Sequence, residues 1–185
     1  RGFQRTLFFA SHPGFFEGIP RWRRRPHEEF VHRVIEKLAP TCEILTSMET
    51  GCFLYDLAKN DNGKGEIVEI GSFEGFSTCC LAAGSKAAGR EKVHAVDPQT
   101  MGRQADLRQN LKRAGVADRV VIHEAYSDEA AAQWPPEKKI RLLFIDGDHT
   151  YAAAKTDFLG WEKFVARDGW IVFHDFSPAD FEVCQ

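Results

Sequence analysis

The chain has 185 residues, of which 43% are hydrophobic, and its formal net charge at pH 7 is -3. These values are typical of one globular domain that buries a core without crosslinks, and they argue against a nucleic-acid-binding surface over the whole molecule. No apolar stretch approaches the roughly 20 residues of a membrane helix, and the apolar patch at the N-terminus is too short and broken for a secretory signal. We therefore expect no nucleic-acid or membrane partner.

The five cysteines indicate a reducing compartment. Their number is odd and their spacing shows no CxxC or Cys/His metal pattern, so we expect reduced and mostly buried thiols in a cytoplasmic protein. The cysteines are Cys42, Cys52, Cys79, Cys80 and Cys184.

The first 60 residues have a different character from the rest. Residues 1–26 are rich in aromatics, Arg, Gly and Pro without a period, and are expected to form an irregular arm or lid. Within them, RWRRRPH (21–27) either contacts an anionic ligand or is simply solvated. A helix is predicted from 27 to Pro40, and a second from Thr46-Ser47, with Glu49 completing a capping box with Thr46.

From residue 61 onward, apolar strands alternate with helices. Near-continuous apolar strands of this kind form parallel sheets that helices cover on both faces. We predict an α/β, doubly wound, mostly parallel Rossmann-like sheet, whose ligands bind beyond the C-terminal ends of the strands. The predicted strands are 66–70, 92–96, 119–124, 140–145 and 170–174, and the predicted helices are 76–87, 104–114, 127–134 and 151–165.

The first predicted strand of this region runs into VEIGSFEGFST (68–78), a glycine turn. Gly71 and Gly75 let backbone approach a ligand closely, while Ser72 and Ser77 add hydroxyl groups. The spacing is GxxxG, not the GxGxxG of dinucleotide folds. Glu69, just before the first glycine, suits a cationic ligand end such as an ammonium group. By itself, the pattern is also compatible with an ordinary turn between a strand and a helix.

The next two strand ends extend this prediction. Asp97, in HAVDP, is placed to accept both hydroxyls of a ribose, although such an acid also caps helices. Ala125, Tyr126 and Ser127 follow the third strand, where the adenine usually lies in this fold, and Ser127 is equally suited to cap the next helix. An adenosine ligand with a positively charged amino-acid end best fits S-adenosylmethionine.

The last two strand ends carry acids. Asp146 opens DGDH within FIDGDHTY (144–151), and Asp175 follows the fifth strand. If these strands are neighbours, two carboxylates come close enough to need a cation such as Mg²⁺ between them. His149 could act as a base, whereas His174 would point to the opposite face if its strand continued. Asp148 and Thr150 are assigned to capping.

Taken together, VEIGSFEGFST, VHAVDP, LLFIDGDHTYAAAKTDF and GWIVFHDF resemble class I S-adenosylmethionine-dependent methyltransferases over residues 65–176. Within that class they resemble the branch with the macrolide-sugar and rhamnosyl O-methyltransferases and the cephalosporin-hydroxylase-like proteins. The resemblance implies that Asp146 and Asp175 bind Mg²⁺ and that His149 is the general base. His174 stands where that branch often has an acid, which makes it a candidate third ligand.

These observations predict residues 1–60 as an arm and helices on the substrate side, and 61–185 as an S-adenosylmethionine-binding domain. The class continues into two more strands, which we expect to be missing here. The predicted activity is metal-assisted methyl transfer to a hydroxyl of a vicinal diol, on a sugar or a catechol-like small molecule. The alternatives are a degenerate, non-catalytic binding module and, less favoured, an NAD-dependent oxidoreductase. Self-association stays open.

Overall fold

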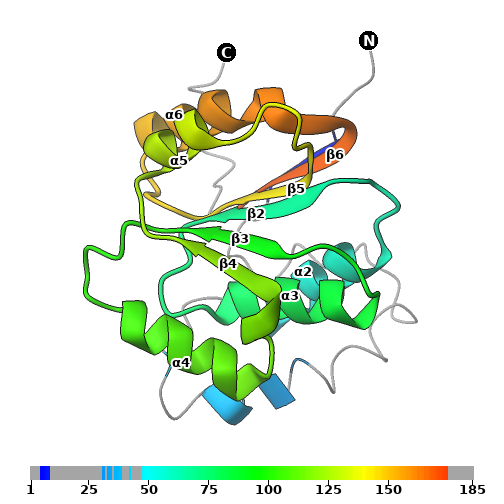
Figure 1. Ribbon diagram of the computed structural model, residues 1–185, viewed down its shortest axis with the longest axis vertical. Helices are drawn as coiled ribbons and strands as arrows, with labels where there is room; N and C mark the ends of the chain where they lie inside the picture. The colour runs from blue at the N-terminus through cyan, green and yellow to red at the C-terminus, as the bar shows by residue number, and fades with distance from the viewer. Residues whose placement is uncertain are drawn as a thin grey trace.

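The structure is a computed structural model that describes the backbone of residues 5–8 and, with side chains, residues 31, 33, 34, 36–38, 42 and 47–174. Its described strands form one parallel sheet in the order β1-β6-β5-β2-β3-β4 (Figure 1). The strands are β1 (Arg5–Phe8), β2 (Glu66–Ile70), β3 (Val93–Val96), β4 (Val120–His123), β5 (Ile140–Ile145) and β6 (Val165–Phe173).

Helices cover both faces of this sheet. On one face lie α2 (Met48–Asn60), α3 (Phe76–Ala87) and α4 (Gln104–Ala114), followed by a 3₁₀ turn, η3 (Ala117–Arg119). On the other lie α5 (Ser127–Gln133), α6 (Tyr151–Trp161) and the 3₁₀ turn η4 (Glu162–Phe164) (Figure 1). The predicted doubly wound α/β fold is confirmed.

The two faces bury separate cores because side chains alternate along each strand. On β2, Ile67 faces the α2–α3–α4 side and Val68 faces the α5–α6 side. On β5, Phe144 joins the first core and Ile145 the second. Trp161 fills the second core with no exposed surface. A sheet buried on both faces leaves only its strand ends for a ligand.

Several element boundaries differ from the prediction. The helix predicted at 151–165 ends at Trp161, because Val165 already pairs with Ile140 as the first residue of β6. The arm predicted as irregular contributes β1, which pairs with β6. Helix α2 is capped by Ser47, whose hydroxyl accepts from the Thr50 N–H at 3.1 Å, so the capping box predicted from Thr46 is wrong.

Other predictions from the N-terminal half are met where the structure describes them. Residues 31, 33, 34 and 36–38 are helical, with Val31, Val34 and Leu38 buried. Helix α2 packs on α3, and Leu54 and Ala58 belong to the core. The division at residue 60 stays a prediction, and RWRRRPH lies outside the described residues.

The cysteines behave as predicted where they are described. Cys42, Cys79 and Cys80 are buried free thiols, Cys52 is partly buried, and Cys184 lies outside the described part of the chain. Burial raises the pKa of the Cys79 and Cys80 thiols above the ordinary value, which keeps them protonated and unreactive. Among the helices that the structure describes, none has the length and apolar character needed to span a membrane.

Candidate active site

A cavity of about 1060 Å³ opens at the C-terminal edge of the sheet. It is bordered by the ends of β2, β3 and β5 and by the starts of α5 and α6, as expected for a parallel α/β sheet. Of the predicted site residues, those that line it are Gly71, Ser72, Gly75, Ser77, Asp97, Tyr126, Ser127, Asp146, His149 and His174. Residues separated by about a hundred positions are therefore assembled into one site.

The glycine turn forms the floor of this cavity, and its glycines are required by close contacts. Gly71 has a φ of 84°, and a Cβ there would lie 2.1 Å from the Asp146 carbonyl oxygen. Gly75 has a φ of 90°, and a Cβ there would lie 2.5 Å from Leu107 Cδ1. The turn is held by the Gly71 N–H, which donates to the Val96 carbonyl at 2.9 Å. A side chain at Gly71 would therefore meet backbone, and one at Gly75 would meet the Leu107 side chain.

Asp97 lies beside the glycine turn, and its carboxylate accepts three backbone hydrogen bonds. Oδ2 accepts from the N–H groups of Ser72 at 3.0 Å and Phe73 at 2.8 Å, and Oδ1 accepts from Gln99 at 2.7 Å. The acid predicted to bind a ribose thus also shapes the turn. Oδ1 retains one further lone pair that can accept from a ligand hydroxyl, whereas both lone pairs of Oδ2 are occupied.

Glu69 is fully buried and is not among the residues that line the cavity, so its contact with a cationic ligand end, directly or through water, stays a prediction. The Thr78 hydroxyl donates to its Oε2. The pKa of Glu69 is raised to about 8, chiefly by burial; hydrogen bonds from the Ser77 and Thr78 hydroxyls lower it, and the nearby carboxylates of Asp146 and Asp97 add to the rise. Near neutral pH this carboxyl is therefore largely protonated.

Glu74, in the same turn, is paired with a cation that the sequence did not reveal. Its Oε1 lies 2.9 Å from Arg103 Nη1, and its side chain is only 3% exposed. The Asn110 side chain donates to the Glu74 carbonyl at 2.9 Å. This ion pair fastens the loop that precedes α4 to the glycine turn. The partners lie 29 positions apart, so no local motif links them.

Asp146 and His174 meet at the ends of β5 and β6. His174 Nδ1 lies 3.0 Å from Asp146 Oδ1, and both side chains are largely buried. His174 can turn toward Asp146 because β6 ends at Phe173, so the strand alternation that would have turned it away does not reach it. Asp175 lies outside the described residues, and within the described ones no group of three metal-ligating side chains occurs.

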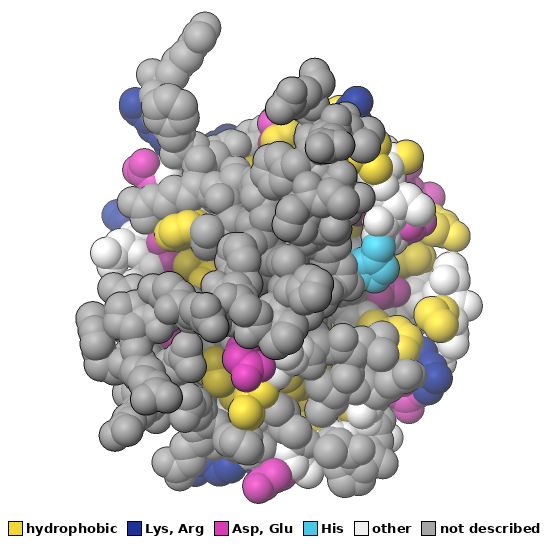
Figure 2. All heavy atoms as spheres, turned by 180° about the vertical axis from the view of Figure 1, so that it is seen from behind, with side chains coloured by type: hydrophobic (Ala, Val, Ile, Leu, Met, Phe, Trp, Pro, Cys, Tyr) yellow, Lys and Arg dark blue, Asp and Glu magenta, His cyan; other side chains and the backbone are white. Residues whose placement is uncertain are grey.

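The loop after β5 presents His149 at the cavity wall. His149 is exposed, and the cavity lining includes it together with Asp146. Seen from behind in the space-filling view of Figure 2, the described surface mixes hydrophobic, basic and acidic side chains. Thr150 caps α6 by accepting from the Ala153 N–H at 3.3 Å, and Asp148 accepts from the Thr150 N–H at 2.9 Å, as predicted.

At the far wall, Tyr126 is the N-cap of α5, so the capping role predicted for Ser127 is wrong. The Ser127 hydroxyl instead accepts from Trp161 Nε1 at 3.0 Å. Tyr126 and Ser127 line the cavity, whereas Ala125 packs against the second core. Asp157 also lines the cavity. It was not predicted as a site residue, because a single acid within a helix belongs to no recognisable motif.

Comparison with known proteins identifies the fold and the family. The family model for a methyltransferase domain matches residues 68–176, which is more than half of the chain. The chain is 34% identical over 135 residues to catechol O-methyltransferase of Mycobacterium tuberculosis, covering 71% of this chain and 56% of that protein. It is also 34% identical over 115 residues to the uncharacterized protein R132 of Acanthamoeba polyphaga mimivirus, covering 60% and 51%. It thus spans about half the length of these relatives.

Among solved structures, an O-methyltransferase from Bacillus cereus in complex with SAH has a TM-score of 0.60 and 25% identity. The match covers 77% of this chain and 64% of that one. The matched family segment begins within β2 and extends past His174, so it contains the glycine turn and the Asp146–His174 pair. The chain belongs to the class I S-adenosylmethionine-dependent methyltransferase family.

Proposed function

We propose that this chain binds S-adenosylmethionine in the cavity and transfers its methyl group to a hydroxyl of a small molecule. The observation that carries the proposal is the assembly of the glycine turn, Asp97, Asp146 and His149 around one cavity within the family-matched segment. The names of the relatives support an oxygen acceptor, since two of them are O-methyltransferases, one of them with catechol as its substrate. The macrolide-sugar branch stays a prediction.

In this proposal each strand end has a separate task. The glycine turn lets the amino-acid end of the cofactor approach backbone, and Asp97 accepts from a ribose hydroxyl with the remaining lone pair of Oδ1. The acceptor oxygen attacks the methyl carbon, the carbon–sulfur bond breaks, and the sulfonium becomes the neutral thioether of SAH. His149 takes the hydroxyl proton at an imidazole nitrogen. Holding both reactants at attack distance supplies much of the rate.

A divalent cation fits the same site. Asp146 and His174 converge at 3.0 Å, Asp175 follows in sequence, and carboxylate oxygens are the ligands that Mg²⁺ prefers. These three residues would hold the ion, which would lower the pKa of the acceptor hydroxyl. A vicinal diol is the acceptor that best uses such a cation. Without the ion, Asp146 and His174 stabilise each other as an ordinary pair.

The first test is calorimetric titration of the chain with S-adenosylmethionine and with SAH, each in Mg²⁺ and in EDTA, beside an NAD control. We expect both sulfur ligands to bind and NAD not to bind. Asp97→Asn should weaken binding about tenfold or more through loss of a charged acceptor. Asp118→Asn is the matched control, because Asp118 is an exposed acid far from the cavity that pairs with Lys86.

Turnover assays with diols then separate the alternatives. Methyl transfer that requires Mg²⁺ and is lost in Asp146→Ala supports the whole proposal. Full activity in Asp146→Ala would overturn the metal-assisted mechanism. Binding of S-adenosylmethionine without transfer to any sugar or catechol acceptor would identify the chain as a binding module.

A further inference from the structure

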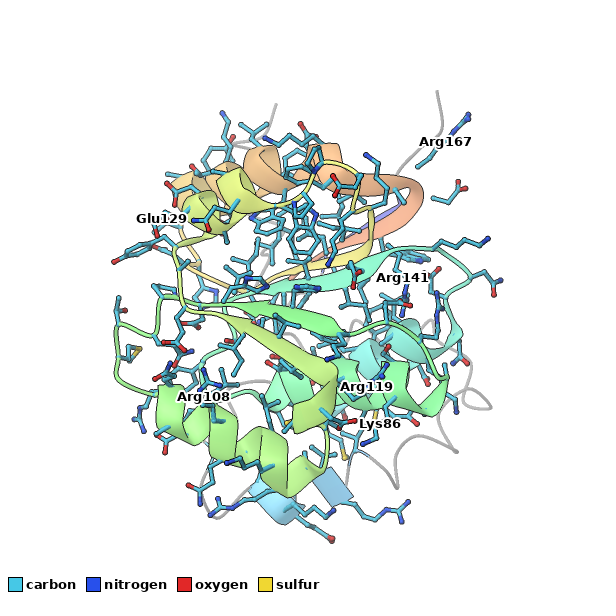
Figure 3. All side chains as sticks on the ribbon, in the orientation of Figure 1. Lys86, Arg108, Arg119, Glu129, Arg141 and Arg167 are labelled. Carbon is cyan, nitrogen blue, oxygen red and sulfur yellow. The ribbon has the colours of Figure 1, made fainter. Side chains whose placement is uncertain are left out.

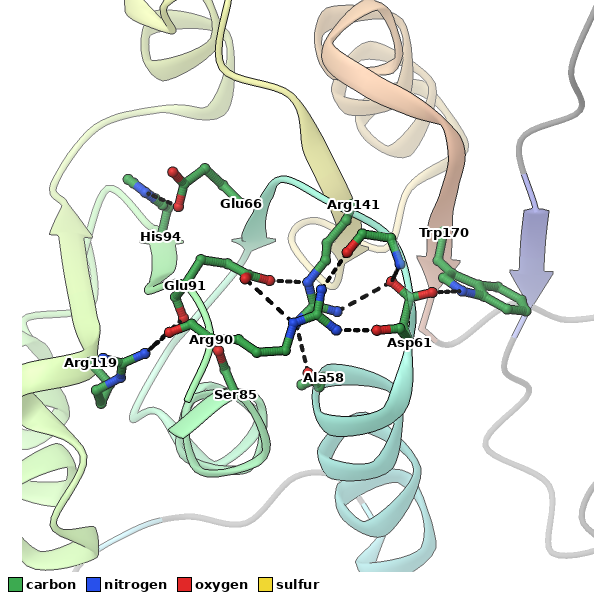
Figure 4. A network of polar contacts seen from close by, with 11 residues as sticks. Ala58, Asp61, Glu66, Ser85, Arg90, Glu91, His94, Arg119, Arg141 and Trp170 are labelled. Carbon is green, nitrogen blue, oxygen red and sulfur yellow. Dashed lines mark hydrogen bonds and ion pairs between the residues drawn. The ribbon is translucent and has the colours of Figure 1, made fainter. Parts of the chain in front are cut away.

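Two histidines outside the cavity lining form a pair across strands β3 and β4. His94 Nδ1 lies 2.9 Å from His123 Nε2, and the two rings stack with their centroids 5.1 Å apart. The other ring nitrogen of His94, Nε2, lies 3.4 Å from Glu66 Oε2 on β2 (Figure 4). Neither histidine lines the cavity, and the proposed chemistry gives this pair no role.

The geometry leaves room for only one proton between the two facing nitrogens. An ionised carboxylate only accepts, so Glu66 favours the proton on His94 Nε2, and His94 Nδ1 then accepts from the His123 Nε2–H. A further proton on His94 Nδ1 would set two N–H groups against each other. Glu66 compensates little for that charge, because its Oε1 also lies 3.7 Å from Lys138 Nζ.

The closed pair therefore resists protonation. The pKa of His94 is lowered to about 4, chiefly by burial and then by the charges of His123, Lys138 and Lys92. Burial and Lys138 also lower the pKa of His123. A histidine released to water has a pKa near 6.5, so an opened pair takes up a proton that the closed pair refuses. The stability that the pair contributes is complete above pH 6.5 and is lost as the pH falls toward 4.

Trp134, directly after the last turn of α5, packs over this pair. Its ring meets the His94 ring edge-on with the centroids 4.8 Å apart, and its Nε1 donates to the Lys138 carbonyl at 2.9 Å. Trp134 is only 6% exposed, so opening the pair to water requires it to move. It also packs against Trp161, whose indole donates to Ser127 in the first turn of α5. Movement of Trp134 therefore loosens α5 from the sheet.

We propose that the His94–His123 pair is an acid-sensitive latch that holds Trp134 and α5 against the sheet. Near pH 7 the two rings share one proton and the latch is closed. Toward pH 5 the proton taken up by the released rings favours the open state. Because Ser127 on α5 lines the cavity, the open state also binds the ligand less tightly, a consequence that rests on the proposed function.

Hydrogen exchange at pH 7 and pH 5, read by mass spectrometry, tests the latch. We expect the protection of α5, relative to that of α3 on the opposite face of the sheet, to fall about twentyfold at the lower pH. This is the factor that one proton gives when its pKa is about 4 in the closed state and about 6.5 in the open one. His94→Gln takes up no proton, so it should remove most of this fall. The matched control is His149→Gln, the same change at an exposed histidine outside the pair, which should keep it.

The exchange data decide the latch by themselves. An equal fall in the wild type and in His94→Gln would overturn it. Equal losses of protection in α5 and α3 would show that the pair stabilises the whole fold without holding α5 in particular, which also overturns it. If His94→Gln does not fold, His123→Gln, which removes the second ring and its charge, must reduce the fall.

Calorimetry with SAH at the same two pH values tests the consequence for the cavity. The affinity should drop more in the wild type than in His94→Gln. Equal drops would overturn the link to the cavity. Absence of SAH binding at pH 7 would overturn the proposed function, whereas the latch would still stand or fall on the exchange data.

Discussion

The two edges of the sheet both bury charged side chains, but they satisfy them differently. At the N-terminal edge, opposite the cavity, a network of polar contacts surrounds Arg141 (Figure 4). Arg141 is fully buried, with Nη1 3.3 Å from Asp61 Oδ2 and Nη2 donating to the Ala58 carbonyl at 2.6 Å. Its Nε pairs with Glu91, and Trp170 donates to Asp61 at 3.1 Å. The N–H donors of Arg141 thus find acceptors within the protein.

At the C-terminal edge the acids are matched mainly by weaker partners. Asp97 accepts from backbone N–H groups, Glu69 from a hydroxyl, and Asp146 faces a histidine. Of these acids, Asp97 and Asp146 line the cavity, where acids without a Lys or Arg partner mark a candidate functional site. Glu74, which also lines the cavity, is paired with Arg103, and that pair braces the glycine turn. The two edges therefore differ in the partners of their buried charged groups more than in how deeply those groups are buried.

The largest expected effect is on stability, from Arg141→Met. The change leaves Asp61 and Glu91 without their buried partner, which typically costs about 3–5 kcal/mol of unfolding free energy. Urea denaturation followed by circular dichroism measures it. The control is Arg108→Met, because Arg108 on α4 (Figure 3) forms an exposed pair with Glu124 at 2.8 Å. That change should cost less than about 1 kcal/mol, and equal losses in both variants would contradict the distinction between the edges.

At the opposite edge, His149→Gln should reduce activity without reducing stability. Loss of a general base lowers the turnover rate by about 10²-fold or more, whereas substitution of an exposed side chain changes the unfolding free energy by about 0.5 kcal/mol or less. Turnover at saturating S-adenosylmethionine, with a thermal melt of the same sample, measures both. An unchanged rate would remove His149 from the mechanism while leaving the cavity as the binding site.

The sequence predicted the parts of this molecule that have a period or a local motif. The apolar runs of β2 and β5 and the helix 76–87 were predicted at their observed boundaries, since burial on both faces leaves no alternative pattern. Gly71, Asp97 and Asp146 were identified because they follow strands, and parallel strands bring their C-terminal ends together.

The sequence did not predict the contacts between side chains that lie far apart along the chain. Arg141 and Asp61 lie 80 positions apart, and Arg103 and Glu74 lie in different loops, so no spacing rule connects them. Asp157 belongs to no sequence motif, although it is buried and lines the cavity. The capping role of Ser127 was predicted wrongly because Trp161, distant in sequence, holds its hydroxyl. These contacts depend on tertiary packing, to which local preference gives way.

A smaller effect is expected from Gly71→Ala, which tests the close approach at the cavity floor. An alanine at a φ of 84° costs about 1–2 kcal/mol, and its Cβ would also collide with the Asp146 carbonyl, so SAH affinity should fall about tenfold or more. The control is Gly89→Ala, at a φ of 64° with nothing within 4 Å, which shares the strain without the collision. If Gly71→Ala keeps full SAH affinity, then the backbone contact does not shape the site.

The last expected effect is gradual, and it is the pH dependence that Glu69 gives to stability. Its pKa is about 8 in the folded protein and near 4.5 when exposed, so between these values the folded state holds a proton that the unfolded state has released. Stability from this group is complete below pH 4.5 and declines as the pH rises toward 8, by at most about 1.4 kcal/mol per pH unit. Glu69→Gln cannot ionise, so its unfolding free energy should gain on the wild type between pH 5 and pH 8. If the difference in unfolding free energy between Glu69→Gln and the wild type stayed constant over that range, Glu69 would already be ionised in the folded protein. The cavity edge would then have a cation that pairs with Glu69, as the opposite edge has Arg141.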